Sequence, residues 1–133
     1  MDNMITSEAP VLETRADLRP EWDERRQAVR IPAIERWVDA EDLDEEEMGW
    51  EQAEMKAMRA GRRLPSREEA LAIALYAKDI NAVLAEHGHR PLSGWYWCGT
   101  SESRRDAWYA WLPGGEIYWA DKYERKHARC ISG

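Results

Sequence analysis

The aromatic-rich stretch at residues 94–132 constrains the fold more than any other part of the chain. It holds five of the eight tryptophans and four of the five tyrosines, and it shows no helical period. The segment Leu112-Pro113-Gly114-Gly115-Glu116 is a strong turn signal, because proline sets φ and glycine permits a positive φ. This pattern predicts a short β-sheet whose rings fill a small core on one face and form a recognition surface on the other.

Alternation within this stretch assigns side chains to the two faces of the predicted strands. Trp95 and Trp97 share one face of the first strand, and Tyr96 and Cys98 share the other. Residues 107–112 and 117–120 form a hairpin across the proline–glycine turn. The remaining predicted elements are a connecting loop at 99–106, a second loop at 120–126 and a final strand at 127–132.

Two amphipathic helical segments precede the aromatic stretch. Residues 48–60 form a helix with Trp50, Ala53 and Ala57 on one face, and Gly61 takes the left-handed position after its end. The sequence Ser66-Arg67-Glu68-Glu69 is a capping box that starts the next helix.

The second helical pattern extends from the capping box to Gly88. Leu71 and Leu75, with Ala72 or Ala74, are expected to face inward, and the pattern continues through Ile80, Val83 and Leu84. A break near Lys78-Asp79, with Asp79 capping a third helix, fits the same residues.

The chain is short enough for one domain, residues 1–133, in which N-terminal strands and an acidic loop (1–47) precede the main unit (48–133). Residues 9–15 could form a short strand, and residues 19–26 a turn or one helical turn. Residues 28–38 resemble an edge or bulged strand interrupted by Pro32, and residues 39–47 an acidic loop.

Charge is unevenly distributed and argues against a nucleic-acid partner. Residues 1–60 hold 17 acidic and 8 basic side chains, giving −9, whereas residues 61–133 hold 9 and 11, giving +2. The acidic half would repel phosphates. No apolar stretch is long enough to span a bilayer and no signal peptide is visible, so we expect no membrane insertion and a cytoplasmic or phage-particle location.

Neither the cysteines nor the histidines predict a cofactor or a metal. Cys98 and Cys130 form no Cys-x-x-Cys pattern, and free buried thiols are favoured over a disulfide. His87 and His89 lack further ligands at useful spacing and suit a helix C-terminus. No catalytic triad or phosphate loop is present, so the sequence does not predict an enzyme.

An ordered series of motifs resembles a known family. The series is Gly49-Trp50-Glu51-Gln52-Ala53, Gly61-Arg62-Arg63-Leu64-Pro65-Ser66-Arg67-Glu68-Glu69, Asp79-Ile80-Asn81, Gly94-Trp95-Tyr96-Trp97-Cys98-Gly99-Thr100-Ser101-Glu102, Ala107-Trp108, Gly115 and Arg129-Cys130-Ile131. Over residues 48–132 this series is similar to the domain of unknown function 1566, the Lcl C-terminal type.

The resemblance implies an α+β, C-type-lectin-like fold, with two or three helices packed on a short twisted antiparallel sheet. Similar domains serve as variable proteins of diversity-generating retroelements in phage and gut bacteria, where the last strands and their loops display ligand-binding side chains. Two features depart from the wider pattern. Cys98-Gly99 replaces the usual Ser-Ser, and the calcium-binding motifs of sugar-binding C-type lectins are absent.

The sequence therefore predicts a non-enzymatic module that binds a protein or cell-surface ligand. Tryptophan, tyrosine and arginine provide large contact area, and serine and aspartate provide adaptable hydrogen bonds. We expect Trp50, Trp95, Trp97, Trp108 and Trp119 in the core, while Trp111 is open between core and surface. In the alternative, a structural protein, the same aromatic surface is the interface of a homo-oligomer. The predicted contact residues are Ser101, Ser103, Arg104, Arg105, Asp106, Tyr109, Trp111, Tyr118, Asp121, Tyr123 and Lys126.

Overall fold

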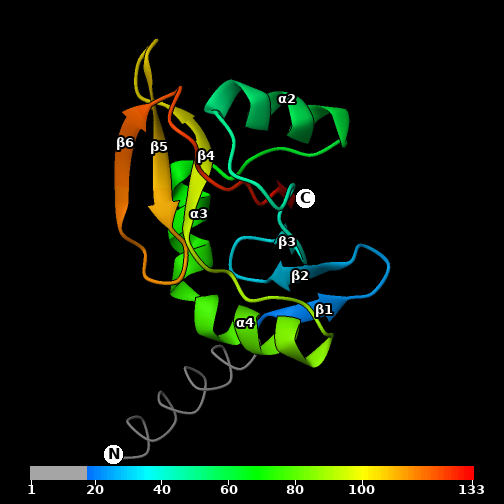
Figure 1. Cartoon of the computed structure of the whole chain (residues 1–133). Coiled ribbons are helices and arrows are strands. Elements are labelled where there is room, and N and C mark those ends of the chain that lie inside the picture. Colours follow the sequence, from blue (N-terminus) through cyan, green and yellow to red (C-terminus); the bar gives the residue numbers. More distant parts are fainter. Residues whose placement is uncertain (1–17) are drawn as a thin grey trace, which may run out of the picture.

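The structure, a computed structural model, describes residues 18–133 and is α+β, with three helices and two antiparallel sheets in that range (Figure 1). The predicted strand at residues 9–15 lies outside the described residues. The elements are β1 (Glu21–Asp23), β2 (Ala28–Ile31), β3 (Arg36–Asp39), α2 (Trp50–Arg59), α3 (Arg67–Leu75), α4 (Ala77–Glu86), β4 (Trp95–Ser101), β5 (Asp106–Trp111), β6 (Ile117–Asp121) and β7 (Ile131–Ser132).

The first sheet joins the N-terminal strands to the end of the chain, in the order β1-β2-β3-β7. Two expectations for this region are wrong. Residues 19–26 contain β1 rather than a turn alone, and residues 28–38 form the two strands β2 and β3 rather than one. Pro32 lies in the turn between them, where a residue without an N–H group and with a fixed φ is well suited.

The predicted final strand at 127–132 is shorter than expected, because only Ile131–Ser132 forms β7. The residues before it contact several elements in turn. The His127 carbonyl accepts from Trp97 N (3.0 Å), the Ala128 carbonyl accepts from Leu43 N (2.8 Å), and the Cys130 carbonyl accepts from Asp39 N (3.0 Å). This segment therefore ties the two sheets and the acidic loop together.

Local signals at the helix ends are confirmed. Ser66 Oγ accepts from Glu69 N (3.1 Å) and Glu69 Oε1 accepts from Ser66 N (2.9 Å), which completes the capping box of α3. Gly61, just past the end of α2, has a φ of +74°. In the described part of the chain, no helix is both long and apolar enough to cross a membrane.

The inward face of α3 differs from the prediction. Ala70 and Ile73 are buried, whereas Leu71 and Leu75 are exposed. Residues 70–75 are apolar without interruption, so periodicity alone does not select a face. Small side chains suit this packing, because the Cβ of Ala74 lies about 3.4 Å from the place a Cβ on Gly115 would occupy.

The boundary between the second and third helices also differs. It lies at Tyr76, which ends α3 and precedes α4, and not at Lys78-Asp79. Asp79 lies inside the first turn of α4, where its charge still favours the helix N-terminus.

The second sheet has the order β4-β5-β6 and divides the apolar interior into two clusters. Figure 1 shows the three strands side by side, with α3 behind them and α2 near one end. On one face lies the α3/α4 core: Val29, Ile31, Val38, Ala40, Ala70, Ile73, Ala77, Ile80, Leu84, Leu92, Tyr96, Cys98, Ala110, Leu112 and Ile131. On the other lies the α2 core: Met48, Ala53, Ala57, Leu64, Trp97, Ala107, Ala128 and Cys130.

The predicted alternation in β4 is confirmed, because Tyr96 and Cys98 belong to the α3/α4 core and Trp97 to the α2 core. Trp119, expected in the core, is instead 56% exposed. It lies on β6, which is the outer strand of the sheet and is paired only with β5.

Candidate binding surface

Four aromatic rings gather on one face of the β4-β5-β6 sheet. The strand register places Trp95 opposite Trp111 and Tyr109 opposite Tyr118, so all four side chains share a face. The ring centroid of Trp95 lies 5.2 Å from that of Tyr109, 5.3 Å from that of Trp111 and 6.0 Å from that of Tyr118. We call Trp95, Tyr109, Trp111 and Tyr118 the aromatic face.

The aromatic face is only partly covered. Tyr118 is 52% exposed, and the other three rings are half-buried. Trp95, expected in the core, belongs to this surface, and Trp111, left open by the sequence, lies beside it. Aromatic pairs at these separations stabilise one another while leaving their outer faces free.

The turn after β5 holds two strands of this face in register. Trp111 N donates to the Glu116 carbonyl (2.8 Å), and Gly115 adopts a φ of +85° that favours glycine. Leu112 is fully buried in the α3/α4 core and anchors the turn to the body of the protein. The predicted proline–glycine turn is thereby confirmed.

Tyr109 and Lys126 mark the boundary between the aromatic face and the interior. Tyr109 packs against the α2 core, and the Lys126 ammonium lies 4.1 Å from the centre of its ring. Lys126 is also paired with Glu124 (3.1 Å) and has only 15% of its side chain exposed. Lys126 therefore supports the aromatic face from beside it and is not a freely displayed contact residue.

A groove of about 630 Å³ adjoins the two predicted loops. Four of the predicted contact residues line it, and five further residues complete the lining. Among the four predicted residues, Tyr123 is 92% exposed. The lining residues are Gly49, Glu51, Gln52, Arg104, Arg105, Asp121, Lys122, Tyr123 and Arg125.

The groove carries more positive than negative charge. Arg104, Arg105, Lys122 and Arg125 face only two carboxylates, one of which, Asp121, lies 3.7 Å from Arg105. The guanidinium of Arg125 donates to the Glu47 carbonyl (2.6 Å), and the Lys122 ammonium lies 4.4 Å from the centre of the Trp50 ring. Arg105, Lys122 and Arg125 thus each contact a neighbouring group, in a protein of net charge −7. We call this hollow the basic groove.

The remaining predicted contact residues shape a loop. Ser101 belongs to β4, so the loop is shorter than predicted. The Ser101 hydroxyl donates to the Ser103 carbonyl (2.7 Å). Ser103 Oγ accepts from the backbone N–H groups of Arg105 (3.2 Å) and Asp106 (3.1 Å). Ser101, Ser103 and Asp106 therefore hold the conformation that presents Arg104 and Arg105.

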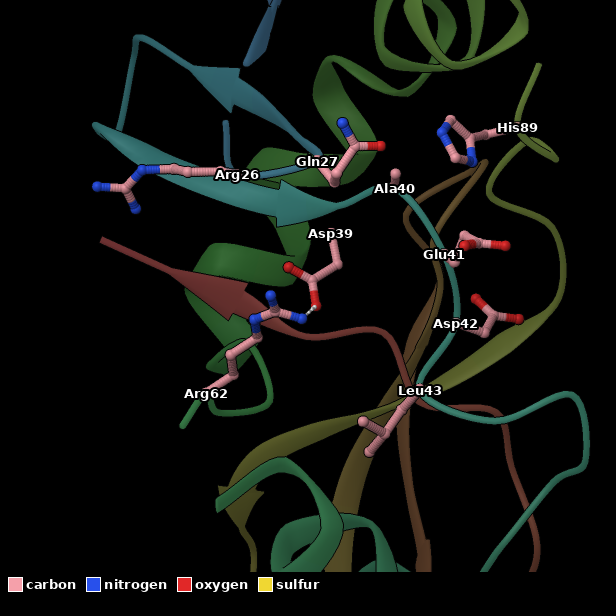
Figure 2. Close-up of a pocket in the computed structure, with 9 residues that line it drawn as sticks. All are labelled: Arg26, Gln27, Asp39, Ala40, Glu41, Asp42, Leu43, Arg62 and His89. Atoms are coloured by element: carbon pink, nitrogen blue, oxygen red, sulfur yellow. Dashed lines mark hydrogen bonds and ion pairs between the residues drawn. The ribbon is translucent and has the colours of Figure 1, made fainter. Parts of the chain in front are cut away.

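A second hollow, of about 290 Å³, lies between the first sheet and the acidic loop. Figure 2 shows Asp39 and Arg62 pointing toward each other there, joined by an ion pair of 2.9 Å. Burial raises the pKa of Asp39, and Arg62 opposes that rise. The carboxylate is thus paired, which is typical of a structural contact.

A buried arginine closes the same region. Arg129 is only 2% exposed, lies 2.8 Å from Asp42, and donates to the carbonyls of Asp39 (3.1 Å) and Ala40 (2.8 Å). Because a buried charge is costly unless it is paired and hydrogen-bonded, this arrangement stabilises the acidic loop against the end of the chain.

The two thiols are free and buried, as the sequence favours. Burial raises the pKa of Cys98 and of Cys130 to about 12, so both remain protonated and weakly nucleophilic at neutral pH. His87 and His89 stack on Trp22, with ring centroids 4.2 and 5.5 Å away. Within residues 18–133, no three histidine, cysteine or acidic side chains form a group suited to a metal.

The sequence alone did not identify several residues of this region. Lys122, Arg125, Glu51 and Gln52 line the basic groove, although β6 and α2 are far apart in the chain. The carbonyl of Lys122 accepts from Trp50 N (3.0 Å), which joins the two segments. Four basic residues among positions 104–125 were the available signal.

Comparison with known proteins finds structural likenesses but no family. No family model matches the chain, and no curated protein matches it. Among solved structures, the chain is similar to the adhesin InvE of Yersinia pseudotuberculosis, with a TM-score of 0.47 and 16% sequence identity. The likeness covers 65% of this chain and 24% of the adhesin, so this chain spans about a quarter of that protein.

Proposed function

We propose that this chain is a non-enzymatic binding module that contacts a protein or cell-surface ligand through the aromatic face and the basic groove. The observation that carries the proposal is the gathering of four rings from three adjacent strands on a face that is partly open to solvent. Tyrosine and tryptophan bury large areas at low entropic cost and dominate contact energies in protein interfaces.

The basic groove supports the same role. Its Arg105, Lys122 and Arg125 side chains make local contacts, and they line the same hollow as the exposed ring of Tyr123. Cations beside aromatic rings suit a ligand surface that carries carboxylates, because charge complementarity steers association and selects partners. An acidic patch on a protein partner is therefore the ligand chemistry that we expect.

The state of the thiols and of the buried charged groups supports binding rather than catalysis. The thiols are protonated, and Asp39 and Arg129 are engaged in ion pairs. The carboxylate of Asp121 is paired with Arg105 at the edge of the groove.

We further propose that the fold is C-type-lectin-like and that the chain is related to the domain of unknown function 1566 and to the variable proteins of diversity-generating retroelements. The motif positions support this relation. Trp50 begins α2, Ser66 caps α3, and Tyr96-Trp97 lies in β4 with a ring in each core. A neighbouring reverse-transcriptase gene and a near-copy of residues 95–131 differing mainly at adenines are the genomic features to look for. Absence of both would contradict the retroelement assignment.

The experiment that tests the binding role compares matched variants of the immobilised chain. Trp111→Ala with Tyr118→Ala removes two partly exposed rings from the aromatic face, and Arg104→Ala with Arg105→Ala removes two cations of the basic groove. Met58→Ala, on α2, is the control because Met58 is 69% exposed and lies outside both surfaces.

The wild-type chain and the Met58→Ala control should retain the same proteins from cell-surface extracts, and both double variants should lose them while remaining folded by circular dichroism. Retention that is equal across all four chains would contradict the proposal. If the double variant of Trp111 and Tyr118 changes the oligomeric mass in solution without changing the retained proteins, the oligomer-interface alternative is favoured.

A further inference from the structure

The outer strand β6 has an open edge. It pairs with β5 on one side, and Figure 1 shows it as the outermost strand of its sheet. Trp111 N donates to the Glu116 carbonyl, and Lys122 N donates to the Arg105 carbonyl. These two bonds show which residues of β6 direct their backbone groups toward β5 and which direct them away. By that alternation, the backbone N–H and C=O groups of Ile117 and Trp119 point away from β5.

The outward backbone groups of β6 are available for pairing. Among residues 18–133, no backbone or side chain is hydrogen-bonded to the N–H or C=O groups of Ile117 or Trp119 on that side. Natural edge strands are often protected by a proline, a bulge or charged side chains along the strand. The strand Ile117–Asp121 has no proline and no bulge, since its register with β5 is continuous, and the charged residues Glu116, Asp121 and Lys122 lie only at its two ends.

Exposed rings lie on both faces of this edge. Tyr118 belongs to the aromatic face, and Trp119 lies on the opposite face, with its ring centroid 5.1 Å from that of Trp108. Both are about half exposed. A strand added to β6 would cover apolar surface on both faces of the sheet and would form hydrogen bonds with the unpaired backbone groups.

We propose that a second copy of this chain pairs with β6, strand against strand and antiparallel, about a two-fold axis at Trp119. The pairing joins two three-stranded sheets into one continuous sheet. A two-fold axis requires each contact to occur twice, so the strand must be complementary to an antiparallel copy of itself.

The charged residues that flank β6 meet that requirement in this register. With Trp119 opposite Trp119, Ile117 lies opposite Asp121 and Tyr118 opposite Ala120, so the whole strand overlaps. One position further, Glu116 lies opposite Lys122 on the same face, and this opposite-charge pair forms twice. A shift by two residues in either direction separates Glu116 from Lys122 and shortens the overlap. Charge complementarity therefore selects a copy of this chain as the partner and Trp119 as the centre.

The pairing has a consequence for ligand binding, which rests on the proposed function. Residues directly opposite in antiparallel strands point to the same face. The aromatic faces of the two copies would therefore lie side by side on one face of the joined sheet. Two linked sites on one surface bind a multivalent partner more tightly than either site alone.

The test is the mass of the full chain in solution by sedimentation equilibrium over a range of concentrations, without any ligand. We expect a concentration-dependent species of twice the 15.5 kDa of one chain. Trp119→Pro should abolish it, because the lost N–H group faces away from β5 and the intrachain hairpin keeps its bonds. Met58→Ala is the control and should leave the mass distribution unchanged.

Charge reversal tests the register. Glu116→Lys alone and Lys122→Glu alone should each raise the dimer dissociation constant by about tenfold, because each creates two like-charge pairs. The double variant, Glu116→Lys with Lys122→Glu, should restore wild-type dimerisation. Circular dichroism of each variant at low concentration confirms the monomer fold.

Four outcomes would overturn the proposal. A chain that remains monomeric at every concentration has no such pairing. A dimer that persists in folded Trp119→Pro uses another surface. Charge-reversed single variants that dimerise as well as the wild type exclude this register. Capture of a different protein by β6 of a monomeric chain would likewise replace the second copy with another partner. Loss of ligand retention with an unchanged dimer would instead count only against the proposed binding function.

Discussion

Trp95 and Trp97 lie two residues apart on the same face of β4, and their surroundings differ. Trp97 is fully buried in the α2 core, and its indole N–H donates to the Met48 carbonyl (2.8 Å). Trp95 lies beyond the cover of α2, among the half-exposed rings of the aromatic face. The same residue type with the same alternation therefore has two roles, and the helix packed on one end of the sheet decides between them.

The buried end should be the more sensitive to mutation. Trp97→Ala removes the largest fully buried side chain and leaves the Met48 carbonyl without its donor. We expect the free energy of unfolding to fall by about 3–5 kcal/mol. Denaturant unfolding measures it, with Tyr118→Ala as the matched control on the open end. Equal losses for the two variants would remove the distinction between the ends.

A pH-dependent contact joins the start of α3 to the segment that precedes it. Arg63 donates to both carboxylate oxygens of Glu69 (2.6 and 2.7 Å) and, with the Ser66 contacts, lowers the Glu69 pKa to about 2. Its ordinary value is 4.5. Because the folded state favours the ionised form, this stabilisation is fully present above pH 4.5 and is lost as the pH falls toward 2.

Glu69→Gln should therefore lower the melting temperature at pH 6 and make little difference at pH 2. Thermal unfolding of the variant and the wild type at both pH values measures the effect. A difference of the same size at pH 2 and pH 6 would show that the Glu69 charge does not contribute.

The open end should tolerate substitution. Tyr118 is half exposed, and its ring is tilted against those of Trp95 and Tyr109 with centroids 6.0 and 6.1 Å apart, so Tyr118→Ala should change the free energy of unfolding by less than about 1 kcal/mol. Denaturant unfolding at a concentration where the chain is monomeric is the measurement. A loss comparable with that of Trp97→Ala would place Tyr118 in the core.

Local signals in the sequence predicted local structure well. The capping box at Ser66, the left-handed Gly61 and the proline–glycine turn all depend on a few adjacent residues, and all are confirmed. The inward face of α3 was not predictable, because the apolar run at residues 70–75 offers no single stripe. The side of the helix that packs is decided by the sheet.

The candidate surface was also predictable only in part, because some of its residues depend on contacts between distant segments. Tyr109, Trp111 and Tyr118 were among the predicted contact residues, and the structure brings the three together on one face. Trp95 and Trp119 were placed in the core because the sequence pattern shows neither how much of the sheet α2 covers nor that β6 is an outer strand. The basic groove joins α2 to the loop after β6, a contact between segments too distant for any local pattern to indicate.

The central claim is that residues of the open surface serve display rather than folding, and two matched libraries test it directly. One library randomises Arg104, Trp111, Tyr118 and Tyr123, and the other randomises Trp97, Cys98, Ala107 and Ala110. Each is displayed on a surface and challenged with protease, and the fraction of resistant, folded members is counted. We predict that most members of the first library resist cleavage and that almost none of the second do. Equal sensitivity of the two libraries would contradict the division of this sheet into a buried end and a display surface.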